Sequence, residues 1–123
     1  MRIVIVGVCA SGKTSLATKC QALGYNADTI AQEHSEVPTL WRHNAPDVLI
    51  YLDASLAAIG KRRDVDWGED FLAQERQRLE NARQACDLYV KTDEINEDQV
   101  FRRVRRFLEK KEREIDKRRH DMV

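Results

Sequence analysis

The sequence predicts an α/β fold: a three-layer α/β/α arrangement around a short parallel sheet of about four strands. A continuous β-branched run, Ile3 to Val6, is typical of a strand that is buried on both faces of a parallel sheet. Further on, segments with strand character alternate with segments of helical periodicity, which is the pattern of right-handed β-α-β crossovers. The 123 residues predict a single domain, because two halves would each be too small to hold a core.

The first half of the chain supplies three of these strands and one helix. After Gly7, a glycine-bearing loop leads into a helix that begins near Lys13, and Gly24 is placed as its left-handed C-terminal cap. Residues 25–31 predict a weak strand, diluted by polar side chains, and residues 47–52 predict a strong one.

Capping residues mark the helices of the second half. Ser55 is placed to cap a helix that ends near Arg62, and Asp66 with Glu69 resembles the reciprocal cap of a longer helix. The apolar stripe expected on that longer helix comprises Leu72, Leu79, Ala82 and Cys86.

The last strand and the last helix follow. Residues 87–90 predict a short fourth strand, and Asn96 with Gln99 opens the final helix. Its apolar stripe comprises Val100, Val104, Phe107 and Leu108. Between residues 109 and 121 only Ile115 is apolar, so we expect residues 109–123 to form a charged helical extension exposed to solvent, with a partner-binding role as the alternative.

Composition narrows the function classes. Acidic and basic residues number 21 each, so no overall field attracts the protein to nucleic acid or to a membrane, and a small-molecule partner is favoured. The cysteines Cys9, Cys20 and Cys86 match neither a disulfide framework nor a zinc pattern, which predicts reduced thiols. The apolar start is too short for a signal peptide, and no stretch approaches the roughly 20 apolar residues of a membrane span. We therefore expect a cytoplasmic protein.

One motif carries the expected chemistry. Gly7-Val8-Cys9-Ala10-Ser11-Gly12-Lys13-Thr14 matches the spacing of the Walker A loop and lies between a strand and a helix. Glycines let successive amides curve around an anion, and the helix N-terminus adds its positive end. Lys13 can reach the β and γ phosphates, and the Thr14 hydroxyl can ligate Mg²⁺. The loop therefore predicts binding of a nucleoside triphosphate, ATP in the first instance, with Mg²⁺.

The variable loop position Cys9 has two interpretations. A small side chain that fills space is the favoured one. A redox role is the alternative, because a helix N-terminus can lower the pKa of a thiol.

With this loop in place, the chain resembles a shortened form of the P-loop nucleoside and nucleotide kinases, the group of thymidylate, adenylate and shikimate kinases. Residues 46–53 look like the strand before the lid of thymidylate-type kinases, and Lys61, Arg62 and Arg63 fall where the lid bases begin. Residues 85–93 are similar to the strand and loop near the nucleotide base. The resemblance covers most of residues 1–108 and implies a P-loop NTPase fold and a small kinase-type phosphotransferase acting on a small-molecule acceptor. It departs from the family in one respect, because only residues 24–45 are available for a substrate-binding insertion.

Candidate catalytic residues follow from the resemblance and from the sheet. Glu33 comes directly after the second strand, where open α/β sheets place their ligands, and is expected to hold a Mg²⁺-bound water or to accept a proton from the acceptor. The alternative is that Glu33 and His34 are solvated and that Ser35 caps a short helix over residues 37–41. A metal role for His34 is disfavoured, since no second ligand lies at helical spacing from it.

Two further positions also have two interpretations each. Asp53 is expected as a Walker B carboxylate that binds Mg²⁺, as a cap of the helix at Ser55, or in both roles at once. Arg62 and Arg63 are expected to stabilise the transferred phosphoryl group, or else to be solvated at a helix end.

Other function classes remain as rivals. A GTPase is disfavoured: Lys91-Thr92-Asp93 follows Val90 rather than Asn or Thr, and no Asp-x-x-Gly follows the second or third strand. The main alternative is a catalytically degenerate nucleotide-binding module with a regulatory or assembly role.

Overall fold

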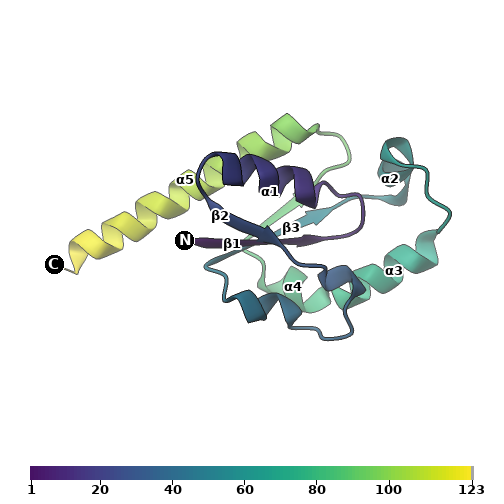
Figure 1. Ribbon diagram of the computed structural model, residues 1–123, viewed down its shortest axis with the longest axis horizontal. Helices are drawn as coiled ribbons and strands as arrows, with labels where there is room; N and C mark the ends of the chain where they lie inside the picture. Colours follow the sequence, from purple (N-terminus) through teal and green to yellow (C-terminus); the bar gives the residue numbers. More distant parts are fainter. Residues whose placement is uncertain (123) are drawn as a thin grey trace.

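The computed structural model describes residues 1–122 and contains one four-stranded sheet with helices on both faces (Figure 1). The strands are β1 (Arg2–Gly7), β2 (Asn26–Thr29), β3 (Val48–Asp53) and β4 (Leu88–Lys91), in the spatial order β2-β1-β3-β4. Every pairing is parallel, so all four carboxyl ends lie along one edge of the sheet. The predicted α/β class and the predicted parallel sheet are confirmed.

Two groups of helices form the outer layers. On one face, α1 (Lys13–Ala22) packs beside α5 (Glu97–Asp121), and their buried residues share a cluster with the sheet. On the opposite face lie α3 (Glu69–Arg78) and α4 (Glu80–Ala85) (Figure 1), and buried residues of α2 (Leu56–Arg62) belong to the same cluster. Two short 3₁₀ helices, η1 (Gln32–His34) and η2 (Leu40–Asn44), connect β2 to β3.

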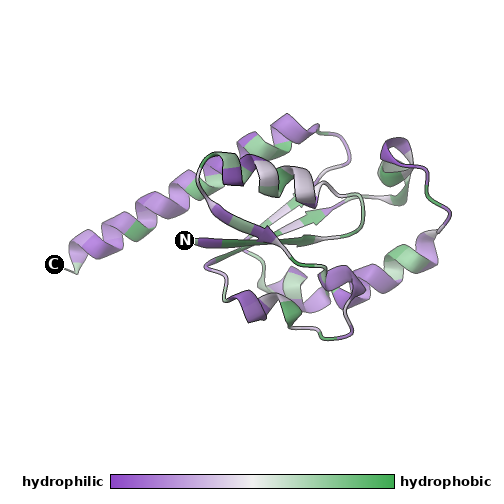
Figure 2. Ribbon diagram, in the orientation of Figure 1, coloured by the Kyte–Doolittle hydropathy of each residue, from purple (hydrophilic) through white to green (hydrophobic). Residues whose placement is uncertain are grey.

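The central strands β1 and β3 are buried on both faces, as their apolar runs predict. Ile3 and Ile5 pack toward α1 and α5, whereas Val4 and Val6 pack toward α2, α3 and α4. All four side chains are fully inaccessible to solvent. Hydrophobic residues accordingly concentrate along the strands, while the far half of α5 is almost uniformly hydrophilic (Figure 2).

Local capping signals have a mixed outcome. The Ser55 side chain accepts from the Ala58 amide at 3.2 Å, and Asn96 with Gln99 forms the reciprocal cap of α5, so both predictions are confirmed. The cap predicted at Asp66 is wrong, because α3 begins after Gly68 and has no side-chain cap. The helix predicted over residues 37–41 is also wrong, since the 3₁₀ turn lies at Leu40–Asn44.

The long helix expected after Glu69 is interrupted at Leu79. Gln32 Nε2 donates to the Arg78 carbonyl at 3.3 Å beside this interruption. A side chain that inserts at a helical carbonyl is a recognised cause of such breaks. Cys86 consequently lies at the end of α4 and is half-buried rather than part of a continuous buried stripe.

The final helix behaves as its stripe predicts. Val100, Val104 and Leu108 are buried against the sheet, and most residues from Glu109 to Asp121 are exposed although helical. Within residues 1–122, none of the helices combines the length and the hydropathy that crossing a bilayer requires.

Candidate functional site

The loop of residues 7–14 joins β1 to α1 at the carboxyl edge of the sheet. Gly7 pairs with Leu52 of β3, and a Cβ on Gly7 would overlap the Leu52 carbonyl oxygen and lie 2.9 Å from Ser11 Oγ. Gly12 has a φ of 99°, which side chains disfavour. The two glycines of the motif are therefore favoured for different reasons. Gly7 allows the close approach of two strands, and Gly12 allows a left-handed turn into α1.

A cleft of about 630 Å³ opens over this loop. The loop forms its floor, and the end of α2 and the connection from β4 to α5 form its walls. The lining residues are Cys9, Ala10, Ser11, Gly12, Lys13, Thr14, Ser15, Leu16, Glu33, Arg62, Arg63, Thr92, Ile95, Asn96, Glu97 and Val100. This volume is in the range of ordinary ligand pockets, roughly 300–1,000 Å³.

The floor of the cleft is rich in hydrogen-bond donors without acceptors. Leu16 makes the first amide bond of α1, to the Gly12 carbonyl, so the amides of Lys13, Thr14 and Ser15 have no acceptor within the helix. Ser11 Oγ is buried and has no hydrogen-bond partner among residues 1–122. Donors gathered at a helix N-terminus favour an anion.

Lys13 is the charged group of this floor. Its Nζ donates to the carbonyls of Gly7 at 2.9 Å and Val8 at 3.0 Å, and to Glu33 Oε2 at 2.6 Å. The Lys13 and Glu33 side chains are 13% and 5% exposed, so this is a buried ion pair.

Glu33 reaches Lys13 because β2 pairs with β1 and η1 begins shortly after β2 ends. The expectation that Glu33 is solvated is therefore wrong, whereas the His34 side chain is half-exposed. Glu33 Oε1 is buried and has no hydrogen-bond partner in the described part of the chain. The carboxylate predicted to act in catalysis thus lies beside the loop.

The two arginines both line the cleft but differ in their contacts. Arg62 donates to the Ala10 carbonyl at 3.1 Å, to Thr92 Oγ1 at 3.0 Å and to the Thr92 carbonyl. It therefore ties the loop to the segment after β4. Arg63 is exposed at the end of α2.

Asp53 is directed elsewhere. Its carboxylate accepts from the Ala54 amide at 2.9 Å, from the Tyr89 hydroxyl at 2.7 Å and from Arg76 at 3.3 Å, and Asp53 is not among the cleft residues. Burial, together with the bond to Asp53, raises the pKa of Tyr89 to about 12. Ser55 rather than Asp53 caps α2. These contacts do not favour the Mg²⁺ role of Asp53.

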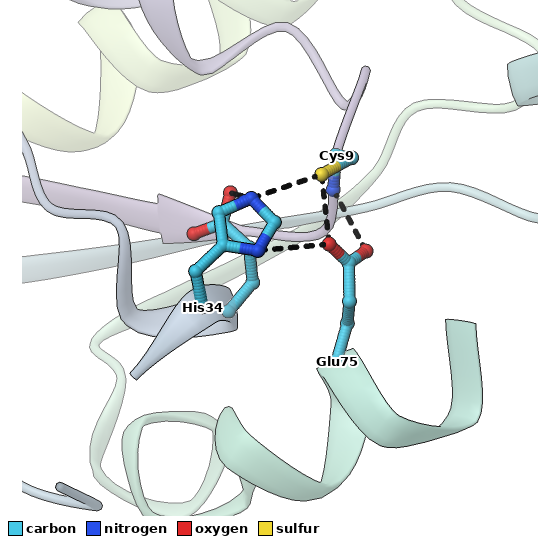
Figure 3. A group of neighbouring side chains, drawn as sticks. Cys9, His34 and Glu75 are labelled. Carbon is cyan, nitrogen blue, oxygen red and sulfur yellow. Dashed lines mark hydrogen bonds and ion pairs between the residues drawn. The ribbon is translucent and has the colours of Figure 1, made fainter. Parts of the chain in front are cut away.

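A second polar group lies under the loop, on the side of α3 (Figure 3). Cys9 Sγ donates to Glu75 Oε2 at 2.7 Å, and the Cys9 amide donates to Glu75 Oε1 at 3.1 Å. His34 Nε2 lies 3.4 Å from Cys9 Sγ. Burial, the bond to Glu75 and the charge of Glu33 raise the pKa of Cys9 to about 12. This shift is opposite to the one that a helix N-terminus alone would cause, and it disfavours a reactive thiolate.

Glu75 is the residue of this group that sequence reasoning missed. It is fully buried, although glutamate is rarely so unless it is paired. A signal was present, because Glu75 lies three residues after Leu72 and four before Leu79, on the buried face of its helix. A charged residue within an apolar stripe marks a buried polar contact.

Comparison of the chain with protein-family models and with curated proteins finds no match.

Proposed function

We propose that this chain binds a nucleoside triphosphate, ATP in the first instance, with Mg²⁺ in the cleft over residues 7–14, and transfers a phosphoryl group to a small acceptor, as P-loop kinases do. One observation carries the proposal. The floor of a cleft of about 630 Å³ combines the Lys13 ammonium, the amides of the first turn of α1 and the unpartnered Ser11 hydroxyl. All of these groups attract the same kind of ligand, a polyanion.

The loop residues divide the work of binding. Amides of Lys13, Thr14 and Ser15 donate to phosphate oxygens, and Lys13 Nζ adds a positive charge that its stem can move along the phosphates. The Thr14 hydroxyl lines the cleft and would hold Mg²⁺, which neutralises charge on the terminal phosphates when it is bound.

Glu33 is the proposed acid-base and orienting group. In the structure its carboxylate is bound to Lys13, and its second oxygen has no partner in residues 1–122. A triphosphate gives Lys13 a new anionic partner. Glu33 is then free to hold a Mg²⁺-bound water or to accept the proton of the acceptor hydroxyl.

Arg62 and Arg63 complete the cleft. Arg62 holds the Ala10 carbonyl and the segment after β4, so it fixes the loop relative to the opposite wall. Arg63 has an exposed guanidinium at the cleft wall and is the better candidate to stabilise charge on the transferred phosphoryl group.

The test combines calorimetry with Mg·ATP and a transfer assay with a panel of small hydroxylated acceptors. We expect binding and turnover in the unaltered chain and loss of both in Lys13→Ala. That variant leaves Glu33 buried without its cation, so the double variant Lys13→Ala/Glu33→Gln is measured alongside it to keep the fold intact. Lys19→Ala is the matched control, because Lys19 is on the same helix but outside the cleft.

Absence of any binding heat at millimolar Mg·ATP or Mg·GTP, with the fold verified by circular dichroism, would refute the proposal. If the folded double variant still binds Mg·ATP as the unaltered chain does, Lys13 does not have the proposed role in binding.

A second function, a nucleotide-binding module without catalysis, is favoured by one observation. Of residues 24–45, where related kinases bind their acceptor, only Glu33 reaches the cleft. Tight binding of Mg·ATP with neither hydrolysis nor transfer to any acceptor would select this function.

A further inference from the structure

Four side chains capable of binding a metal ion converge under the loop. Cys9 comes from the loop, His34 from η1 and Glu75 from α3 (Figure 3). Glu33, the fourth, also comes from η1. One ligand atom from each lies within 4.8 Å of the corresponding atom of every other. Cys9, the adjacent pair Glu33 and His34, and Glu75 are far apart in the sequence, so the fold brings these three segments together.

We propose that Cys9, His34 and Glu75 bind a thiophilic divalent cation of the Zn²⁺ class, with Glu33 as the fourth ligand. This ion is distinct from the Mg²⁺ that accompanies the nucleotide. Thiolate, imidazole and carboxylate together suit a borderline-soft, four-coordinate ion and do not suit Mg²⁺, which prefers oxygen ligands.

The distances fit such an ion. Tetrahedral Zn²⁺ with ordinary bond lengths separates its ligand atoms by about 3.4–3.6 Å. One ring nitrogen of His34 can bind the ion, and Nε2 lies 3.4 Å from Cys9 Sγ and 4.0 Å from Glu33 Oε2. Glu75 Oε2 faces the other nitrogen, Nδ1, at 3.8 Å, so the imidazole or the Glu75 carboxylate has to shift for both residues to bind one ion. The contact of 2.7 Å between Cys9 Sγ and Glu75 Oε2 has to open by less than about 1 Å. In the structure the Cys9 thiol hydrogen lies between Sγ and Glu75 Oε2, the two atoms that would both bind the ion.

Charge supplies an independent argument. Lys13 neutralises Glu33, whereas within residues 1–122 the hydrogen bonds to the fully buried Glu75 come from the amide and the thiol of Cys9, both neutral, and the half-exposed His34 ring lies 3.8 Å away. Buried carboxylates are normally paired with a cation or bound to a metal. A divalent ion that displaces the thiol proton has two positive charges, and these balance one thiolate and one carboxylate.

The contacts of Glu33 suit it to be the fourth ligand of the ion. Glu33 Oε1 is buried without a partner in residues 1–122, in a side chain that is 5% exposed. Glu33 Oε2 lies 4.0 Å from His34 Nε2, so this carboxylate borders the ion site as well as Lys13. His34 is half-exposed and forms the side from which an ion can enter.

The test uses the tag-free, chelator-treated full chain, without nucleotide, titrated with Co²⁺ as a spectroscopic probe. We expect one Co²⁺ per chain, a sulfur-to-cobalt charge-transfer band in the near ultraviolet, and displacement by Zn²⁺ but not by Mg²⁺. Cys9→Ser should abolish the band. Glu75→Gln should weaken affinity by more than about 100-fold, since even partners outside the ligand shell contribute 10- to 100-fold.

Matched controls separate this site from the other thiols and histidines. Cys86→Ser and His43→Gln should bind Co²⁺ as the unaltered chain does, because neither residue belongs to the cluster. Thermal denaturation of every variant confirms its fold, and Glu75→Gln, which preserves shape, serves if Cys9→Ser does not fold.

A charge-transfer band that persists in folded Cys9→Ser, or equal Co²⁺ affinity in folded Glu75→Gln, would overturn the proposal. So would the absence of the band at millimolar Co²⁺ in the unaltered chain. None of these results bears on Mg·ATP binding, which is measured separately.

Discussion

A glycine-to-alanine series tests the reason given for the first glycine of the loop. A Cβ on Gly7 overlaps the carbonyl of Leu52, which is held by the pairing of β1 with β3 and cannot move without disturbing both strands. Overpacking of this kind costs about 1–3 kcal/mol. For 123 residues, 1 kcal/mol corresponds to about 4 °C in the midpoint of thermal unfolding, so Gly7→Ala should lower it by about 4–12 °C.

Alanine substitutions at two other glycines provide controls, one expected to raise the stability of the protein and one expected to lower it. Gly60 lies inside α2 with open space around it, so Gly60→Ala should raise stability by about 0.5–1 kcal/mol. Gly24 also has open space but a φ of 88°, so Gly24→Ala should cost about 1–2 kcal/mol through backbone strain alone. Only Gly7→Ala should also impair binding of Mg·ATP.

The assay is thermal unfolding followed by circular dichroism, with calorimetry for Mg·ATP. If Gly7→Ala unfolds within 1–2 °C of the unaltered chain, at the ~4 °C per kcal/mol used above, the close approach to Leu52 imposes no real constraint. Loss of nucleotide binding in Gly24→Ala would show that the effect on the loop is not local.

Three more predictions follow from the contacts. Asn96→Ala removes the cap of α5 and should cost about 1 kcal/mol in urea unfolding, and an unchanged midpoint would contradict the capping argument. Lys13→Ala should lower the free energy of unfolding by about 3–5 kcal/mol, because it leaves the buried Glu33 carboxylate without its cation. The double variant with Glu33→Gln should recover much of this stability. A double variant no more stable than the single one would refute the buried pair. Cys9, with a pKa of about 12, should alkylate very slowly at pH 8 in metal-free protein, and Glu75→Gln should accelerate the reaction, because removing the carboxylate lowers that pKa and raises the thiolate fraction. Mass spectrometry of the alkylated peptide checks this, and equal rates would contradict it.

Strands, caps and the loop could be predicted from sequence because each depends on near neighbours. The run from Ile3 to Val6 is buried on both faces, as β-branched residues at consecutive positions predict. Ser55 and Asn96 cap their helices because a cap needs only an amide two or three residues away.

The errors arise where distant contacts decide. Asp66 and Glu69 have the spacing of a reciprocal cap, but Gly68 is the N-cap residue and the helix starts at Glu69. The interruption at Leu79 coincides with Gln32, which lies 46 positions before the carbonyl that it contacts. No periodicity within α3 and α4 contains that information.

The candidate site shows the same division. The loop itself was predicted residue by residue, and so was Glu33, although as one of two interpretations. Its burial against Lys13 depends on the pairing of β1 with β2. Helical spacing predicts no second ligand for His34, whereas Cys9 and Glu75 lie near it through the tertiary fold.

The polar residues beneath the loop are not explained by stability. Buried charges often can be replaced by apolar residues of similar volume without loss of stability, and here Glu33 and Glu75 are both buried against the loop. Each carboxylate depends on one loop residue, Glu33 on Lys13 and Glu75 on Cys9. A ligand that takes Lys13 or the thiol proton away from its carboxylate leaves a buried negative charge without a partner, unless the ligand also brings a cation. The two proposed ligands would meet this condition, the magnesium triphosphate at Lys13 and the divalent ion at Cys9, because each brings a metal cation with it.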